Sequence, residues 1–302
     1  MSSPRDAASN EAPARLRDVA ERAGVDPSLV SRVLSGSLPF SIRDETRERI
    51  VAAAAELDYR PNAQARALRR RRSMLIGMIV PTLSNVVYER IHEGAAKRAE
   101  ELGYSLVVAA GTADDFRDLL HGQVDGLLLA VATEKHAPVL LPRGLRLPIV
   151  LVNRASEGLT SVTVDDAAGA RLATQHLFEL GHRRVGHLAG PSELDTGRRR
   201  LQGFLEACRE RGEEPAADLI AEGGYSEREG FAAMHRLLDR PDRPTAVFVA
   251  NLLAAVGALA AARQLGLRVP VDVSVASLHD APLAEYLDPP LTTVRMPLEE
   301  MG

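Results

Sequence analysis

The sequence has 302 residues, of which 45% are hydrophobic and 26% charged, a balance that indicates a soluble globular protein of about two domains. No apolar run approaches the roughly 20 residues that cross a bilayer, and the charged first segment lacks the apolar stretch of a signal peptide, so we expect a cytoplasmic protein without a membrane partner. The single cysteine, Cys208, excludes an intrachain disulfide, and Cys and His show no zinc-ligand spacing, so we expect no metal and no cofactor.

The net charge of −4 is unevenly distributed along the chain. Residues 1–73 hold 14 Arg against 10 Asp and Glu, whereas the remainder is acidic. Binding to DNA needs Lys and Arg that displace the counterions around the phosphates. Only the N-terminal part therefore has the charge for a nucleic-acid surface.

The N-terminal part divides into a tail, a helical unit and a linker. Residues 1–13 are rich in Ser, Ala and Pro without periodicity, which is typical of a disordered tail. Residues 14–60 place apolar positions at helical spacing in three short stretches. Asp26 followed by Pro27 starts the second stretch, since it offers an N-cap acceptor with proline at the first helical position. We predict a compact three-helix unit and an arginine-rich hinge over residues 61–73.

From residue 74 the sequence alternates near-continuous apolar runs with amphipathic helical stretches. The first runs are LIGMIV, YSLVVA, VDGLLLAV and PIVLV, which are typical of strands buried on both faces of a parallel sheet. A second alternating series follows them. We predict an α/β domain over 74–302, with one lobe over about 74–154 and another over about 163–290. Ligands in such sheets bind at the carboxyl ends of the strands.

Several segments together carry a family resemblance: LRDVAERAGVDPSLVSRVLSG, DETRERIVAAAAELDYRPNAQARAL, LIGMIVPTLSN, VDGLLLA, ELGHRRVGHLAGP and DPPLTTV. In this order they resemble the LacI/GalR family of bacterial transcription regulators. The resemblance implies an all-α helix-turn-helix headpiece joined to a two-lobed, periplasmic-binding-protein-like α/β domain with parallel sheets. It also implies a homodimeric repressor of near-palindromic double-stranded operator DNA. A small-molecule effector, sugar-like or an anionic sugar derivative, would control that repressor from between the lobes.

The resemblance makes Pro27–Leu34 the recognition helix. Its expected DNA contacts are Pro27, Ser28, Ser31 and Arg32, with Ser35 at its end. Arg32 is the best candidate for direct readout because a guanidinium pairs bidentately with guanine, and contact to the backbone alone is the alternative. We expect Ser31 and Ser35 on phosphates, while Pro27 offers only apolar contact.

Three hinge residues complete the expected DNA interface. Asn62 matches the start of the family's hinge helix, and Leu68 matches the apolar wedge that opens a base step in the minor groove. Packing against the dimer mate is the alternative for Leu68. Arg66 either lines the groove or stays solvated.

The same resemblance places effector contacts at Tyr88, Asn153, Arg200, Asn251 and His279. Arginine suits a carboxylate or a pair of sugar hydroxyls because its fork presents two parallel donors. Tyr88 lies where the family has an aromatic that stacks on the ligand, with ordinary core packing as the alternative.

The chain departs from the family pattern at several positions. Leu252 follows Asn251 where the family has aspartate, and His279 replaces a carboxylate that often holds sugar hydroxyls. A cleft with Arg200, His279 and fewer acids suits an anionic ligand. Family members also continue past LTTVRMPLEEMG with a helix and a strand that shape the dimer interface, so the chain is short at this end and its dimer is expected from the resemblance alone.

Two other classes of protein compete with a regulator. A periplasmic solute receptor would share the two lobes, but the basic headpiece and the charged first segment count against it. An enzyme would need a catalytic motif, and the sequence contains no GxSxG, no GxxxxGK[ST] and no HExxH. We therefore expect no enzymatic activity.

Overall fold

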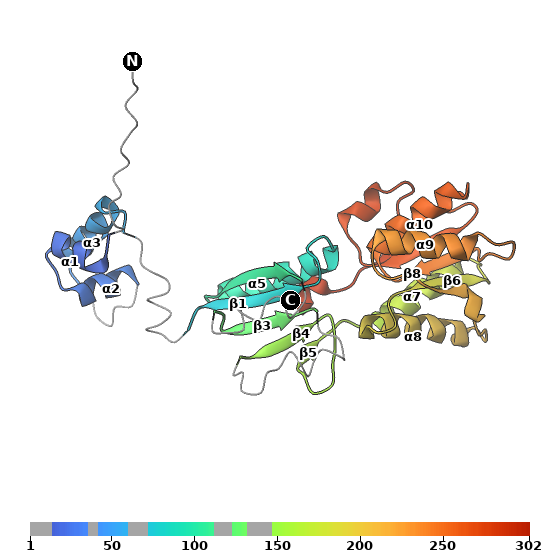
Figure 1. Ribbon diagram of the computed structural model, residues 1–302, viewed down its shortest axis with the longest axis horizontal. Helices are drawn as coiled ribbons and strands as arrows, with labels where there is room; N and C mark the ends of the chain where they lie inside the picture. The colour runs from blue at the N-terminus through green and yellow to red at the C-terminus, as the bar shows by residue number, and fades with distance from the viewer. Residues whose placement is uncertain (1–13, 36–41, 60–71, 112–122, 132–146) are drawn as a thin grey trace, which may run out of the picture. The chain divides into compact units, whose positions relative to one another are not determined.

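The computed structural model describes residues 14–35, 42–59, 72–111, 123–131 and 147–302 (Figure 1). Its internal contacts divide the chain into two units, Met1–Ser73 and Met74–Gly302. The tail over residues 1–13 and the hinge residues Asn62, Arg66 and Leu68 lie outside the described residues.

Three helices are described in the first unit: α1 (Leu16–Ala23), α2 (Pro27–Leu34) and α3 (Asp44–Glu56). Gly24 ends α1 with φ 65°, a left-handed conformation that glycine adopts without steric penalty. Asp26 caps α2 as predicted, because its side chain accepts the backbone N–H two residues further on at 2.7 Å. Val19, Val30 and Ile50, which are completely buried, join the three helices in one apolar core.

The second unit begins with a lobe built on one parallel sheet. Its elements are β1 (Leu75–Val80), α5 (Val86–Glu101), β2 (Ser105–Ala110), β3 (Gly126–Leu129), β4 (Ile149–Val152) and β5 (Ser161–Val162). The strand order is β2-β1-β3-β4-β5. The sheet extends past the predicted limit at residue 154 because β5 pairs with β4, with Ser161 opposite Leu151.

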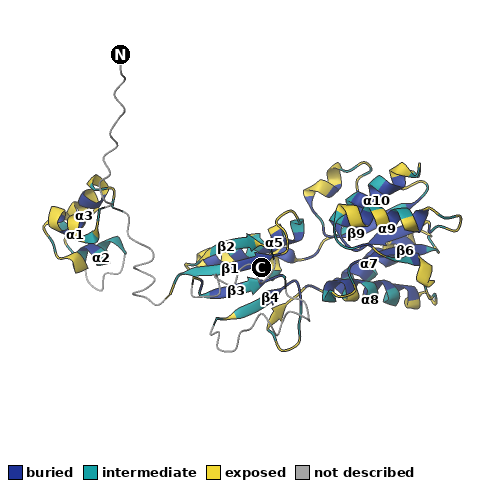
Figure 2. Cartoon of the chain, in the orientation of Figure 1, coloured by how far each residue is buried: buried dark blue, intermediate teal, exposed yellow. Residues whose placement is uncertain are grey.

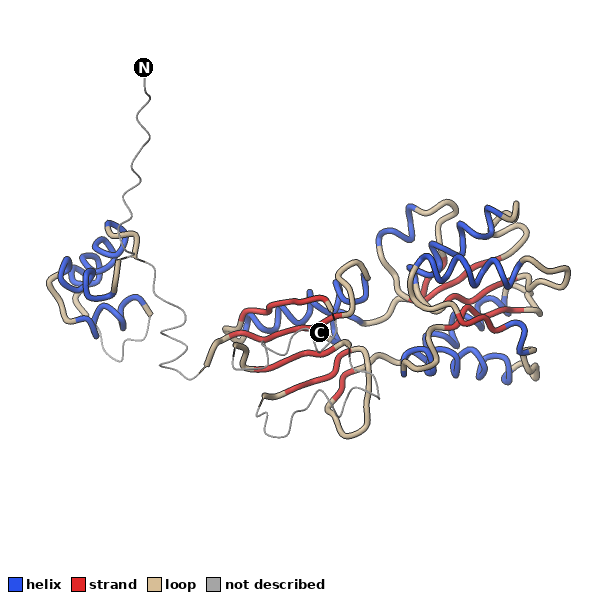
Figure 3. Tube along the Cα trace, in the orientation of Figure 1, coloured by secondary structure: helices blue, strands red, loops and turns tan. Residues whose placement is uncertain are grey.

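The second lobe is a parallel sheet in the order β10-β9-β8-β6-β7. Its elements are α7 (Asp166–Glu179), β6 (Val185–Ala189), α8 (Asp195–Glu210), η2 (Ala217–Leu219), β7 (Ile220–Glu222), α9 (Glu227–Leu238), β8 (Ala246–Val249), α10 (Leu252–Gln264), β9 (Ser274–Leu278), η3 (Pro282–Tyr286) and β10 (Thr292–Val294). Helices α7 and α8 cover one face of this sheet, and α9 and α10 cover the other (Figure 3). The sheet ends at β10, past the predicted limit at residue 290, because Thr292 pairs with Ala276.

Burial follows the layers of the sheet. The central strands β6 and β8 are buried along their whole length, as expected for strands covered on both faces (Figure 2). The chain passes from β5 into α7 and, after β10, into α11 (Leu298–Met301), which lies against α5 of the first lobe. A Cβ at Gly94 in α5 would collide with the carbonyl of Glu299, so glycine permits this close approach.

The packing of α8 on α7 generates a stability prediction. A Cβ at Gly203 would collide with the backbone carbonyl of Ala167, which cannot rotate away as a side chain can. Gly203→Ala should therefore force the two helices apart and lower the free energy of unfolding by about 1–3 kcal/mol, despite alanine's better helix propensity. Urea denaturation measures the change, with Gln202→Ala as the control at an exposed neighbour on the same helix. Equal stability of the two variants would contradict the prediction.

Candidate functional site

The outer face of α2 is polar and accessible. Pro27, Ser28 and Arg32 are exposed, whereas Val30 is completely buried on the opposite side. Ser28 and Arg32 are four residues apart and so neighbour each other on the helix surface. Ser35, at the end of the helix, donates from its hydroxyl to the carbonyl oxygen of Arg32 at 3.2 Å. The helix thus presents a guanidinium on the face that the sequence predicts to read DNA, and the individual contacts stay predictions.

A second group of polar side chains gathers in the second unit, near the ends of parallel strands. Asn153 and Arg154 follow β4, His279 follows β9, Arg200 lies in α8, and Asp166 is the first residue of α7. We call these five residues the polar cluster. Each is at most 7% exposed. The carboxyl ends of parallel strands are where open α/β sheets bind ligands, so the cluster lies where a site is expected.

The guanidinium of Arg200 is held by the protein on three sides. Its Nε donates to Oδ1 of Asp166 at 2.7 Å, and its Nη1 donates to the carbonyl oxygen of Ala250 at 2.9 Å. Its Nη2 lies 3.2 Å from Nε2 of His279. Its Cζ lies 5.1 Å from the centre of the Tyr225 ring, within range of a cation–π contact. The direction of the Arg200 fork is therefore fixed.

Asp166 is the carboxylate that holds this arrangement. Burial alone raises its pKa, but the charges of Arg200 and Arg199 outweigh burial and keep the pKa below its usual value. Arg199 donates to Oδ2 of Asp166 at 2.6 Å and also pairs with Asp195. Asp195 in turn accepts the backbone N–H of Ala155 at 2.8 Å. Because Ala155 follows β4 of the first lobe and Asp195 begins α8 of the second, this hydrogen bond connects the ion pairs of the second lobe to the first lobe.

His279 is neutral and carries its proton on Nδ1. A guanidinium has no acceptor, so Nε2 of His279 must accept from Arg200 and the proton must sit on Nδ1. Burial lowers the pKa of His279 to about 3, which keeps the ring uncharged. His279 and Asn153 have φ angles of 74° and 64°, and such left-handed conformations of residues with side chains concentrate at functional sites.

Three atoms of the polar cluster are buried without a hydrogen-bond partner among the described residues: Oδ1 of Asn153, Nε of Arg154 and Nδ1 of His279. Leaving such an atom unsatisfied costs about 1–3 kcal/mol. Buried polar groups in folded proteins nearly always have partners, so orphaned atoms mark a place that a further molecule completes. These atoms identify the polar cluster as the candidate ligand site.

The other two predicted effector residues, Asn251 and Tyr88, lie outside the polar cluster and make contacts within the fold. Asn251 uses its side chain for the fold, since Oδ1 accepts the N–H of Ala254 and caps α10 while Nδ2 donates to the carbonyl of Tyr225 at 2.9 Å. Tyr88, in α5, is 7% exposed and packs in an apolar core, yet it lies close enough to Arg200 to act on it electrostatically. A ligand contact from either residue stays a prediction.

Sequence reasoning missed Arg154, Asp166 and Tyr225. Arg154 belongs to no motif, and Asp166 has the ordinary pattern of an acidic residue at a helix start. The consecutive Arg199 and Arg200 offered a signal, because α8 buries one face and an arginine on a buried face requires a charged partner.

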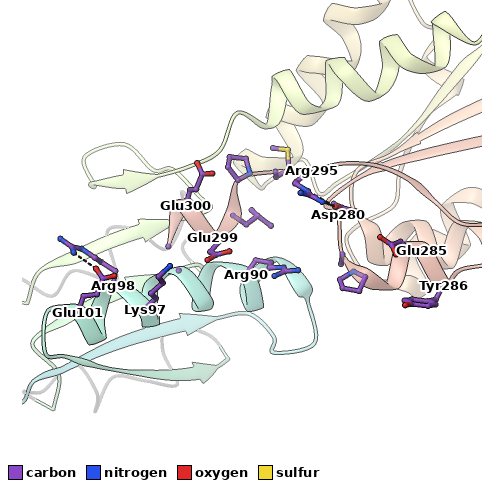
Figure 4. Close-up of a pocket in the computed structure, with 17 residues that line it drawn as sticks. Arg90, Lys97, Arg98, Glu101, Asp280, Glu285, Tyr286, Arg295, Glu299 and Glu300 are labelled. Carbon is purple, nitrogen blue, oxygen red and sulfur yellow. Dashed lines mark hydrogen bonds and ion pairs between the residues drawn. The ribbon is translucent and has the colours of Figure 1, made fainter.

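A separate cavity of about 1080 Å³ lies between α5, η3 and α11 (Figure 4). Two ion pairs join charged side chains of its lining, Arg295 with Asp280 at 2.9 Å and Arg98 with Glu101 at 2.8 Å. The residues that line it include none of the polar cluster. The polar cluster is the stronger candidate because it alone of the two combines burial with unpartnered polar atoms in the described part of the chain.

Within the described ranges, no helix has the length and apolar content of a membrane span. Over the same ranges, His, Cys, Asp and Glu form no group of three or more that could hold a metal ion.

Known proteins resemble this chain over nearly its whole length. Residues 15–62 match the model of bacterial regulatory proteins of the lacI family, and residues 174–302 match that of a periplasmic binding protein-like domain. The ribose operon repressor of Escherichia coli (strain K12) is 35% identical over 299 residues, which cover 96% of this chain and 90% of that protein. The chain belongs to the LacI family. It is therefore a transcription regulator and not an enzyme.

Other members of the LacI family agree with this assignment. The HTH-type transcriptional repressor PurR of Escherichia coli O139:H28 is 35% identical over 300 residues, covering 96% of this chain and 87% of that protein. The crystal structure of the lac repressor dimer bound to operator and the anti-inducer ONPF superimposes with a TM-score of 0.84 at 32% identity, covering 96% of this chain and 89% of that one. The predicted fold class, a helix-turn-helix headpiece with two parallel α/β lobes, is confirmed.

Two buried histidines in the second lobe make its stability depend on pH. His187, in β6, is stacked between the rings of Phe204 and Phe248, at 4.9 and 4.7 Å between ring centres. Burial lowers the pKa of His187 to about 4 and that of His279 to about 3, against 6.5 for an ordinary histidine. The unfolded chain therefore takes up protons below pH 6.5 that the folded chain does not accept until pH 3–4.

We predict that the melting temperature is constant above about pH 7 and falls between pH 6.5 and 5.5, where carboxylates are still ionised. Each histidine should remove up to about 1.4 kcal/mol of unfolding free energy per pH unit. In His187→Leu, the loss of unfolding free energy on acidification should be smaller by the contribution of one histidine. In His176→Gln, which changes an exposed histidine, the loss should equal that of the parent protein. Thermal unfolding of both variants at pH 7.5 and 5.5 measures the fall in melting temperature. If His187→Leu shows the same fall as the parent protein, His187 does not cause the pH dependence.

Proposed function

We propose that this LacI-family regulator represses transcription by binding near-palindromic operator DNA as a homodimer, and that a small molecule at the polar cluster controls this binding. The observation that carries the DNA-binding part is the exposed face of α2, which presents Pro27 and Ser28 in its first turn and Arg32 in its last turn. The crystal structure of the lac repressor dimer bound to operator supports the dimeric arrangement. A repressor of this kind acts in the cytoplasm, where the genome is.

In this proposal α2 enters the major groove of each half-site. Arg32 reads guanine through two parallel hydrogen bonds, Ser28 and Pro27 contact base edges, and Ser31 and Ser35 contact phosphates. The hinge residues, which lie outside the described part of the chain, complete the interface in the minor groove: Asn62, Arg66 and Leu68. A two-fold dimer reads two half-sites, which is why the operator should be near-palindromic.

The effector part of the proposal rests on the three orphaned atoms of the polar cluster. Arg200, His279 and Asn153 hold the effector, with Tyr88 and Asn251 at its edge. Hydrogen bonds of Asp195 and Arg199 to the backbone of Ala155 and Asn153 connect the same region to the first lobe. A ligand shifts the equilibrium between lobe arrangements by its difference in affinity for them, and only one arrangement suits operator binding. Structures such as the CelR–cellobiose complex, 34% identical to this chain, support a small-molecule effector.

The DNA-binding part predicts the effect of Arg32→Ala. The operator is first selected from genomic fragments by retention on the full chain. If Arg32 reads guanine, the variant should bind this operator about 5- to 150-fold more weakly, which corresponds to about 1–3 kcal/mol, and should discriminate less at one base pair. If Arg32 only contacts phosphate, specific and non-specific binding should weaken alike, with a shallower salt dependence. Gel shifts at several salt concentrations separate these results.

Arg22→Ala is the matched control, because Arg22 is an exposed arginine of α1 that pairs with Glu56. This variant should keep operator affinity within about twofold, as expected for a surface ion pair. Unchanged operator affinity of Arg32→Ala would exclude a reading role for Arg32. Failure of the parent chain to retain any specific fragment at moderate salt would overturn the proposed function itself.

A further inference from the structure

The hydrogen-bonding groups left over in the polar cluster are mostly donors. Arg200 has five N–H groups, and described residues engage one each on Nε, Nη1 and Nη2, which leaves two. His279 adds the N–H on Nδ1, and Arg154 adds the N–H on Nε. A ligand must therefore bring acceptors to this side of the site.

Acceptors in the cluster are scarce. Both oxygens of Asp166 are occupied, Oδ1 by Arg200 and Oδ2 by Arg199, and the side chain is completely buried. Oδ1 of Asn153 is the unpartnered side-chain acceptor among the described cluster residues. It can receive one hydroxyl of a ligand.

The site also carries a net positive charge. Arg154, Arg199 and Arg200 contribute three positive charges, and Asp166 and Asp195 contribute two negative ones, while His279 is neutral. Of the charged residues in this count, Arg154, Arg200 and Asp166 are buried, so two buried positive charges face one buried negative charge, and burying an uncompensated charge is costly.

Arg154 and Arg200 both act electrostatically on Tyr225, although they come from different lobes. Burial raises the pKa of the Tyr225 hydroxyl, and the positive charges of Arg200 and Arg154 both oppose that rise. The Tyr225 hydroxyl is fixed by a hydrogen bond to Thr196 at 2.8 Å. Both guanidiniums therefore act electrostatically on the same phenol, and Arg200 also lies over its ring.

We propose that the effector is a sugar acid, meaning a polyhydroxylated molecule with a single carboxylate. The carboxylate accepts from Arg154 and Arg200, a hydroxyl oxygen of the same molecule accepts the Nδ1 proton of His279, and another hydroxyl donates to Asn153. This assignment rests on the proposed function, because it takes the polar cluster to be the effector site. A neutral sugar leaves one positive charge uncompensated. A phosphate monoester brings about −1.5 to −2 charges at pH 7 and overcompensates it.

A matched ligand series tests this assignment on the full chain. The probes are aldonic and uronic acids of five- and six-carbon sugars, the parent neutral sugars, and their terminal phosphates. Thermal shift detects binding, because a ligand of the folded state raises the melting temperature, and calorimetry gives the affinities. At least one acid should bind tenfold or more tightly than its parent sugar and its phosphate. Tightest binding by a neutral sugar or a phosphate, or no binding in the series, overturns the assignment.

Arg154→Gln tests the residue that supplies the uncompensated charge. It should weaken binding of the acid at least tenfold while changing the affinity for the parent sugar much less. Arg228→Gln, at an exposed arginine of α9, is the control and should change neither. Equal weakening of acid and parent sugar by Arg154→Gln would mean that Arg154 only supports the fold, and the assignment would fall.

Gel shifts with the selected operator separate this inference from the proposed function. If a neutral sugar or a phosphate binds and alters operator retention, the proposed function stands and the sugar acid is wrong. If a sugar acid binds with the expected preference but leaves operator retention unchanged, the ligand class stands and effector control of DNA binding is wrong.

Discussion

The carboxylate of Asp166, completely buried between Arg199 and Arg200, is the interaction on which the rest of the ligand-binding unit depends. A buried carboxylate is tolerated only when it is paired and hydrogen-bonded, and here each oxygen receives a guanidinium donor. The pairing joins the start of α7 to α8 and orients Arg200. By orienting Arg200, the pairing also fixes the tautomer of His279. Asp166 therefore determines which hydrogen-bonding groups the site presents, although its own oxygens are both occupied.

The same ion pairs, together with one hydrogen bond to the first lobe, connect ligand binding to the arrangement of the lobes. Arg199 holds Asp166 on one side and Asp195 on the other, and Asp195 holds the backbone of Ala155 after β4. Arg154 lies one residue before that contact, with its Nε unpartnered within the described residues. An anion bound between Arg154 and Arg200 therefore contacts both lobes at their connection. Such a ligand favours arrangements that keep the two guanidiniums close, which gives it the difference in affinity that control requires.

The sequence predicted the elements with long, regular patterns and missed what depends on tertiary contacts. Helix α2 has the predicted bounds because Asp26 and Pro27 define its start. Strands β5, β7 and β10 have two or three residues each and carry no apolar run, so no pattern indicated them. The cleft arginine was placed by resemblance, but its carboxylate partner Asp166 becomes visible only when α7 packs on α8. Asn251 was predicted from the resemblance to contact the ligand, but the structure shows that its side chain also caps α10.

The identity of residue 279 sets the charge of the site. The family resemblance assigns a carboxylate to this position, and a carboxylate would balance the three arginines with a third negative charge and accept from Arg200 directly. Histidine removes that charge, and because Arg200 occupies Nε2, it also turns the position from an acceptor into a donor through Nδ1. Both effects favour a ligand that brings its own carboxylate. The residue lies in the loop after β9, so ligand class can change there while the sheets that position the site remain as they are.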